Sequence, residues 1–222
     1  MKFAFSKTHL LFACAIFLLL ALLVYIAMRF RLFSKIEVKE MALGSGILVF
    51  TPYRGSYSNV SEKFAQAMKD FSEFFGKDVR YFGIYYDNPS QLVDPNEGRA
   101  IIGACFDETR NLESFINKHK NYRTVEFKNL KGFGATFPLY NNFDLLVAVV
   151  RGYPAIRAYG IEKKLMDRCL CSVEFYDNSR GTLTIAFPYH ENNESILYQT
   201  GYPVPVIKDD QSVKRSVLKK DE

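Results

Sequence analysis

The sequence predicts an α+β protein built from two similar halves behind a single membrane-spanning helix. Three observations carry this prediction. A long uncharged run lies near the N-terminus, the tripeptide Tyr-Asp-Asn occurs twice after strand-like runs, and residues with helical spacing precede each copy. Each half is therefore predicted to contain, in order, a strand, a helix, a strand, a turn and a strand.

Composition and charge exclude a nucleic-acid-binding surface. The chain has 222 residues, which is room for one sizeable domain with appendages, and 48% of them are hydrophobic. The net charge is +5, but residues 41–207 contain 18 Lys+Arg and 18 Asp+Glu. A nucleic-acid-binding domain needs a basic face. Here the surplus belongs to the membrane flank and the tail.

Residues 10–28 form 19 consecutive residues without a charge, enough to cross a bilayer as a helix. A cleaved signal peptide is the alternative, because Lys2 and Lys7 could form its basic region. The run is longer than such regions usually are, however, and no small-residue cleavage site follows. More basic residues follow the run than precede it: Arg29, Arg31, Lys35 and Lys39. This bias predicts a cytosolic C-terminal side.

The predicted organisation has five parts: an N-terminal flank (1–9), a transmembrane helix (10–28), a basic juxtamembrane linker (29–44), a domain (45–207) with repeats at about 45–110 and 130–190, and a polar tail (208–222). The tail ends in Lys219-Lys220-Asp-Glu. This resembles the dilysine retrieval signal that coatomer reads on endoplasmic-reticulum membrane proteins; a solvated lysine-rich tail is the alternative.

The four cysteines predict neither a metal site nor a disulfide framework. Cys169 and Cys171 form a C-x-C without a second pair, so a zinc site is not expected. Cys14 lies in the apolar run and Cys105 in a strand-like run. We expect buried reduced thiols, no metal and no cofactor.

The repeated tripeptide marks the ends of two strands. Tyr86-Asp87-Asn88 is followed by the strand-like run 99–106, and Tyr176-Asp177-Asn178 by the run 182–189. Asp, Asn and the Pro89 that follows the first copy are turn formers. A turn is therefore the simplest explanation of the repeat.

The repeat also suggests a ligand site at Tyr86, Glu174 and Tyr176. Alternate residues of a strand face the same side, which groups Ile84 with Tyr86 and Glu174 with Tyr176. Matching Tyr86 to Tyr176 puts Glu174 opposite Ile84. If helices cover one face of the sheet, the other face becomes a groove lined by tyrosines with one carboxylate, or else the pair faces the core. A Glu at a strand edge, paired with Lys or Arg, is the structural alternative.

Several segments together resemble the GyrI-like domain family, a duplicated module whose halves often bind small molecules. They are YRGSYSNVSEKFAQAM, GIYYDNPSQLVDPNEGRAIIGACF, FGATFPL and SVEFYDNSRGTLTIAFP. The resemblance implies an SHS2-type β-α-β-β duplication, with an antiparallel sheet and two helices on one face. It also implies that Glu174 matches a glutamate that some relatives use for cationic ligands or hydrolysis. The hydrolase branch pairs that glutamate with Trp, which this chain lacks.

With a membrane span in front, the arrangement is similar to membrane-anchored relatives that act as receptors in autophagy of the endoplasmic reticulum. Those relatives carry a tail motif, an aromatic residue followed three positions later by Leu, Ile or Val, and the tail here has no aromatic residue. Phe143 to Leu146 has that spacing, but we expect it to lie in the core.

Three functions from different classes follow. The first is a non-catalytic adaptor anchored in the endoplasmic-reticulum membrane, which presents the domain to cytosolic protein partners such as autophagy machinery and coatomer. The second is a small-molecule sensor that uses Glu174. The third is a hydrolase, for which no nucleophile–base pair emerges. The sequence favours the first.

Overall fold

The computed structural model describes residues 7–29, 34–107, 111–191, 196 and 199–208. It contains two compact units, which divide after Glu37. The first unit contains the helix α1 (Lys7–Arg29). Its segment His9–Arg29 has a mean hydropathy of 3.0 and none of it is buried within the protein. Among the described residues, this is the one helix long and apolar enough to cross a membrane.

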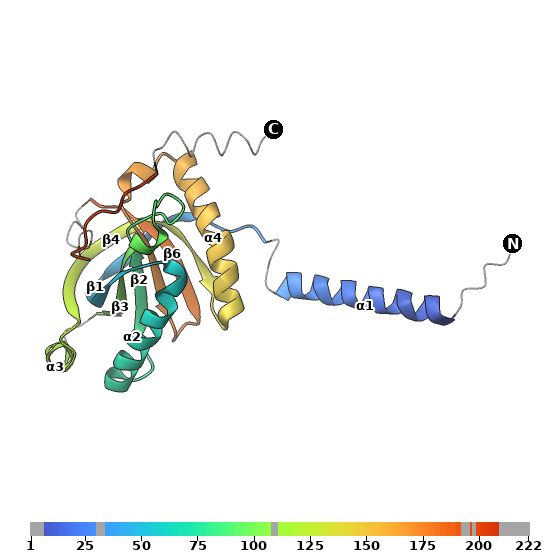
Figure 1. Ribbon diagram of the computed structural model, residues 1–222, viewed down its shortest axis with the longest axis horizontal. Helices are drawn as coiled ribbons and strands as arrows, with labels where there is room; N and C mark the ends of the chain where they lie inside the picture. Colours follow the sequence, from blue (N-terminus) through green and yellow to red (C-terminus); the bar gives the residue numbers. More distant parts are fainter. Residues whose placement is uncertain (1–6, 30–33, 108–110, 192–195, 197–198, 209–222) are drawn as a thin grey trace. The chain divides into compact units, whose positions relative to one another are not determined.

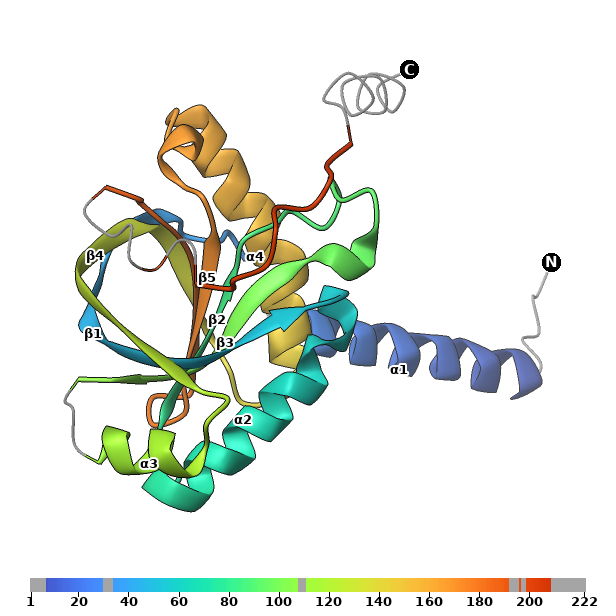
Figure 2. The same ribbon diagram turned by 60° about the vertical axis from the view of Figure 1, so that its left-hand side comes forward.

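The second unit is built on a six-stranded antiparallel sheet that closes into a barrel in the order β1-β3-β2-β5-β6-β4. The strands form a ring in Figure 2, with α2 and α4 outside it. Their bounds are β1 (Lys39–Arg54), β2 (Arg80–Tyr85), β3 (Arg99–Phe106), β4 (Arg123–Pro138), β5 (Ser172–Asp177) and β6 (Thr182–Pro188). The long strands β1 and β4 pair with each other and close the ring.

The interior of the barrel is a hydrophobic core. Phe50, Phe82, Phe127 and Phe175 are each at most 2% exposed and belong to one buried cluster. They alternate along their strands with residues that point outward, as the pleat of a strand requires. The interior is therefore filled by side chains, and the groove expected on the face away from the helices is not formed there.

The outer face of the barrel carries two long helices, α2 (Val60–Phe75) and α4 (Asn142–Glu162) (Figure 1). α2 packs mainly over β3, and α4 over β4 and β6. A second buried cluster joins α2 to the short helix α3 (Leu112–Lys118), where the rings of Phe71 and Phe115 stack 4.6 Å apart. The sequence analysis did not predict α3.

Helix α4 begins at a capping box and lies close to the sheet. The Asn141 side chain accepts hydrogen bonds from the backbone N–H groups of Phe143 and Asp144, and the Asp144 carboxylate accepts one from the Asn141 N–H. Gly160 makes the close approach possible, since a Cβ there would lie 2.5 Å from the Phe133 ring. α4 is continuous through Pro154.

The predicted fold class is confirmed: the domain is an α+β duplication of β-α-β-β units, with both long helices on the outer face of an antiparallel sheet. Two expectations need correction. β1 begins at Lys39, so the end of the expected linker 29–44 belongs to the sheet. Phe143 and Leu146 are not core residues, because they are 40% and 55% exposed.

The four cysteines are free thiols. Cys105 and Cys171 are buried, as predicted, whereas Cys169 is half-buried and Cys14 is exposed on α1. Burial raises the pKa of Cys105 to about 11 and that of Cys171 to about 12. Both side chains therefore stay protonated at neutral pH.

Candidate functional site

A buried carboxylate lies at the centre of the outer face of the sheet. Glu174, on β5, is 4% exposed. Its neighbours in the strand, Val173 and Phe175, point into the barrel core, so the strand pleat turns Glu174 to the side on which the helices lie. β5 pairs with β2, and these two strands lie between the sites where α2 and α4 pack.

Three tyrosine hydroxyls donate hydrogen bonds to Glu174, and we call these four residues the tyrosine–carboxylate cluster. Tyr153 of α4 donates to Oε1 at 2.8 Å. Tyr85 of β2 and Tyr176 of β5 donate to Oε2, at 3.1 Å and 2.5 Å. Among the described residues, Glu174 forms no ion pair with Lys, Arg or His. The alternative of a Glu paired with a basic side chain is therefore not what the structure contains.

Burial decides the protonation chemistry of the cluster. Desolvation raises the pKa of Glu174, and the hydrogen bonds from Tyr176, Tyr153 and Tyr85 partly oppose that rise. Desolvation, together with the charge of Glu174, raises the pKa of each tyrosine well above its ordinary value. The tyrosines are therefore neutral donors at physiological pH.

A glycine makes room for one of the donors. Gly83 is paired with Glu174 across the β2–β5 ladder. A Cβ on Gly83 would lie 2.9 Å from the Tyr85 hydroxyl and 3.1 Å from its ring. The Tyr85 ring therefore lies over the bare backbone of Gly83 and reaches Glu174. The ring of Tyr57 packs edge-on against Tyr85 at 5.1 Å.

Both long helices contribute to the surroundings of the cluster. Tyr153 comes from α4 itself. Phe64, on α2, lies edge-on to the Tyr176 ring, with 5.1 Å between the ring centroids. Tyr153 and Tyr176 are half-buried, whereas the carboxylate beneath them is fully covered. The tyrosines thus separate Glu174 from solvent.

The structure brings together two of the three predicted ligand-site residues, Glu174 and Tyr176, and leaves out Tyr86. The Tyr86 side chain packs against the barrel core, and its hydroxyl donates to the carbonyl of Ile196 at 2.6 Å. The repeat alignment was one residue out of step: the position that corresponds to Tyr176 is Tyr85. A shift of one residue moves a strand side chain to the opposite face.

Sequence reasoning missed two members of the cluster, Tyr85 and Tyr153. Gly83 was the signal for Tyr85, because a glycine within a strand often marks a close approach. Tyr153 had no comparable signal, since it depends on how α4 packs across the sheet. The sorting residues Lys219 and Lys220 lie outside the described residues.

The repeated Tyr-Asp-Asn segments are turn and ion-pair elements. The Asp87 carboxylate accepts two hydrogen bonds from the Arg99 guanidinium, one from Nη2 at 2.8 Å and one from Nε at 3.0 Å. Both side chains are largely buried. Asp177 accepts hydrogen bonds from the hydroxyl of Ser179 and the N–H of Arg180 in the tight turn before β6. The turn interpretation of the repeat is confirmed.

A separate polar hollow of about 570 Å³ lies where β1 and β4 bulge apart. Its charged groups are largely paired: Arg168 binds both oxygens of Glu191, and the Tyr189 hydroxyl donates to Glu40. None of its lining residues belongs to the tyrosine–carboxylate cluster. Because the charged groups of the hollow are largely paired, the tyrosine–carboxylate cluster is the stronger candidate site.

The tyrosine–carboxylate cluster combines one buried carboxylate with three hydroxyl donors. A carboxylate in a place of low dielectric attracts a cation or a hydrogen-bond donor strongly. Within the described part of the chain, no His or Cys side chain contacts Glu174: His119 packs on Phe115, and His190 Nδ1 lies 2.8 Å from the Arg168 carbonyl oxygen. No group of three potential metal ligands occurs among the described residues.

Comparisons with known proteins give structural matches at low identity. No protein-family profile matches the chain, and no curated protein matches it. Of the solved structures, the EcmrR C-terminal domain aligns at 12% identity and a TM-score of 0.42, covering 69% of this chain and 96% of that domain. SAV2435 bound to tetraphenylphosphonium aligns at 11% identity and a TM-score of 0.43, covering 72% of this chain and 99% of that chain. A hydrolase from Listeria innocua aligns at 8% identity and a TM-score of 0.42, covering 71% of this chain and 95% of that chain.

Proposed function

We propose that this chain is a single-pass membrane protein whose barrel domain is a non-catalytic binding module for a lipophilic organic cation. The observation that carries the proposal is the buried carboxylate of Glu174, which has three tyrosine donors and no basic partner among the described residues. A buried carboxylate without a counter-charge pays a desolvation cost that a bound cation offsets.

The tyrosines suit a ligand of this kind in two ways. Their rings offer π-faces to a cation, an attraction of about 0.5–2 kcal/mol per favourable contact. Tyr153 and Tyr176 are half-buried, so a rotation of either side chain opens a path to Glu174. Rotamer changes of this kind are common when ligands bind, even where the backbone barely moves.

The test is a thermal-shift comparison on the full chain in lipid nanodiscs. Tetraphenylphosphonium is the probe, and tetraphenylborate, of nearly the same shape and opposite charge, is the control ligand. We expect the phosphonium to raise Tm and the borate to leave it unchanged. Glu174→Gln removes the charge without changing the shape and should abolish the shift. Tyr86→Phe, on the opposite face of β2, should retain it. Equal shifts in Glu174→Gln and the unchanged protein would refute the proposal.

The proposed location is the endoplasmic-reticulum membrane, with the domain in the cytosol. The basic residues after the apolar run support the cytosolic side, and the family resemblance supports the endoplasmic reticulum. Asn59-Val-Ser61 supplies a reporter, because Asn59 is exposed in the domain and fits the glycosylation pattern. We expect the domain to be unglycosylated and digested by protease added to intact microsomes. A glycosylated, protected domain would overturn this topology.

An adaptor role in autophagy of the endoplasmic reticulum is the second candidate, supported by the membrane span and the family resemblance. It differs from the ligand-binding role in one respect that can be measured. An adaptor that does not depend on Glu174 should retain the same protein partners in proximity labelling after Glu174→Gln, whereas a ligand-controlled module should gain or lose some of them.

A further inference from the structure

The solvent-facing side of α4 is apolar except for one arginine. We define the α4 outer face as Phe143, Leu146, Val150, Pro154, Arg157 and Ile161, which recur at steps of three and four residues. Phe143, Leu146, Val150 and Ile161 are 40%, 55%, 61% and 62% exposed.

The inner side of α4 combines small residues with the fully buried Ile156. The residues that face the sheet include Ala148, Gly152 and Gly160, which are buried and small. A surface helix ordinarily turns its bulky apolar residues to the core and polar residues to solvent. α4 is apolar on both sides, and an exposed apolar face of this extent marks a contact surface.

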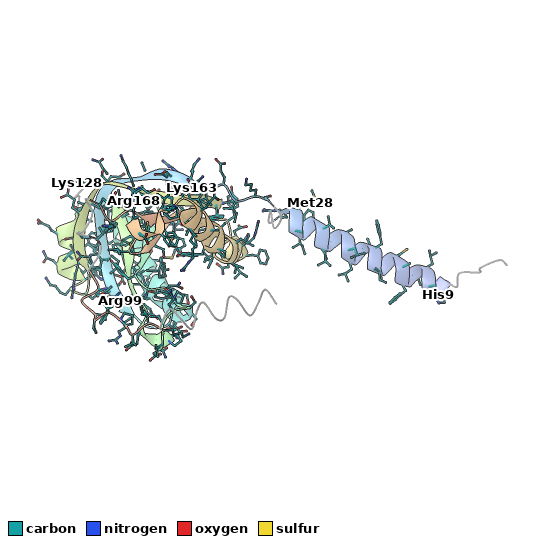
Figure 3. The ribbon with its side chains drawn as sticks, turned by 90° about the horizontal axis from the view of Figure 1, so that it is seen from above. His9, Met28, Arg99, Lys128, Lys163 and Arg168 are labelled. Carbon is teal, nitrogen blue, oxygen red and sulfur yellow. The ribbon has the colours of Figure 1, made fainter. Side chains whose placement is uncertain are left out.

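Charge indicates what the surface contacts. Arg157 is the one charged member of the α4 outer face, and it is exposed. Lys163 and Arg168 follow the carboxyl end of α4 (Figure 3), where Lys163 pairs with Glu162 and Arg168 pairs with Glu191, and Lys164 beside them is exposed. The acidic residues of α4 lie elsewhere: Asp144 is buried in the cap, and Glu162 pairs with Lys163 at 3.2 Å. An apolar face edged by cations is the pattern of helices that lie on anionic bilayers.

We propose that the α4 outer face rests on the surface of an anionic lipid bilayer, with Phe143, Leu146 and Val150 in the headgroup–acyl boundary and Arg157 among the lipid phosphates. The proposal rests on the membrane-anchor part of the proposed function, because residues 30–38 alone separate α1 from β1. A second copy of the chain fits the surface less well. The face runs about 27 Å along the helix, and a strip of that length and one helix wide falls short of the roughly 1,000 Å² expected of a stable interface.

The test exploits the absence of Trp from the chain. One tryptophan is introduced at a time into the full chain, which is reconstituted into vesicles of phosphatidylcholine and phosphatidylserine with brominated acyl chains. Val150→Trp probes the α4 outer face. Lys69→Trp, at an exposed position on α2, is the matched control, and Leu20→Trp reports the membrane insertion of α1. Bromine quenches tryptophan only at short range, so the loss of fluorescence reports contact with acyl chains.

We expect Leu20→Trp and Val150→Trp to lose most of their fluorescence and Lys69→Trp to keep it. Adding Arg157→Glu to Val150→Trp should reduce the quenching, since each cation at an anionic surface is worth about fivefold in binding. Quenching at Leu20→Trp without quenching at Val150→Trp would overturn the proposal while leaving the anchor intact. A blue shift at Val150→Trp without quenching, growing with protein density, would assign the face to a second copy instead. No quenching at Leu20→Trp would instead show that α1 does not insert, a failure of the anchor itself.

Discussion

Gly83 lies directly opposite Glu174 in the ladder between β2 and β5, and its missing side chain is what lets Tyr85 reach the carboxylate. The tyrosine ring occupies the space that any other residue at position 83 would fill. A single backbone position therefore determines whether one of the three donors can be in place.

Gly83→Ala should displace the Tyr85 hydroxyl and remove its hydrogen bond to Glu174. The loss of a hydrogen bond to a charged buried group costs about 1.5–3 kcal/mol of the free energy of unfolding. Tyr85→Phe removes the same bond directly. Because the bond can be lost once only, the double variant should be less destabilised than the sum of the two singles. Chemical unfolding of the four proteins measures this, and strict additivity would contradict the geometry.

Glu174→Gln should change how stability depends on pH. The carboxyl pKa is 4.5 in the unfolded chain and is raised in the folded one by burial. As pH rises above 4.5, the unfolded state releases its proton first, so the unchanged protein loses stability until the pH passes the folded pKa. The variant has no such group. The difference in Tm, unchanged protein minus variant, should therefore fall as pH rises above 4.5 and level off once the pH exceeds the folded pKa. A constant difference would mean that Glu174 has an ordinary pKa.

Asp87 and Asp177 are the aspartates of the two Tyr-Asp-Asn tripeptides, but they should respond differently to loss of charge. Asp87→Asn leaves the Arg99 guanidinium, 12% exposed, without its partner. Breaking a buried ion pair costs about 3–5 kcal/mol. Asp177 faces an Arg180 that is 81% exposed, at 3.6 Å, and Asp177→Asn should cost less than about 1 kcal/mol. Equal costs in denaturant unfolding would show that the Asp87–Arg99 pair is not buried in solution.

Gly160→Ala should destabilise the domain although alanine favours helices. In an exposed helix this substitution gains about 1 kcal/mol. Here the new Cβ would lie 2.5 Å from the Phe133 ring and 2.7 Å from the Met166 sulfur. Overpacking of this kind costs about 1–3 kcal/mol, so the sign of the change in unfolding free energy should reverse. A stabilised variant would mean that α4 lies farther from β4.

The sequence predicted most of the long elements of the fold because their signals are local, whereas the seven-residue helix α3 was not predicted. Helical spacing predicted α2, and turn residues predicted the ends of β2 and β5. Closure of the sheet was not predictable, since it depends on the pairing of β1 with β4 over long sequence separation.

The sequence predicted two of the four residues of the tyrosine–carboxylate cluster. Glu174 and Tyr176 lie in one strand, where their relation follows from the pleat. Tyr85 and Tyr153 reach them from another strand and a helix, so their places depend on register and packing. The exposure of the α4 outer face was not predictable for a related reason: a run of apolar residues does not reveal which side faces the sheet.

The central claim is that Glu174 holds a cation, and equilibrium dialysis tests it most directly. The full chain in nanodiscs is dialysed against tetraphenylphosphonium, with empty nanodiscs as the blank for partition into lipid. The account predicts saturable uptake above the blank by the unchanged protein and by Tyr86→Phe, and uptake equal to the blank by Glu174→Gln. Uptake by Glu174→Gln that matches the unchanged protein, or uptake by the unchanged protein that does not exceed the blank, would contradict it.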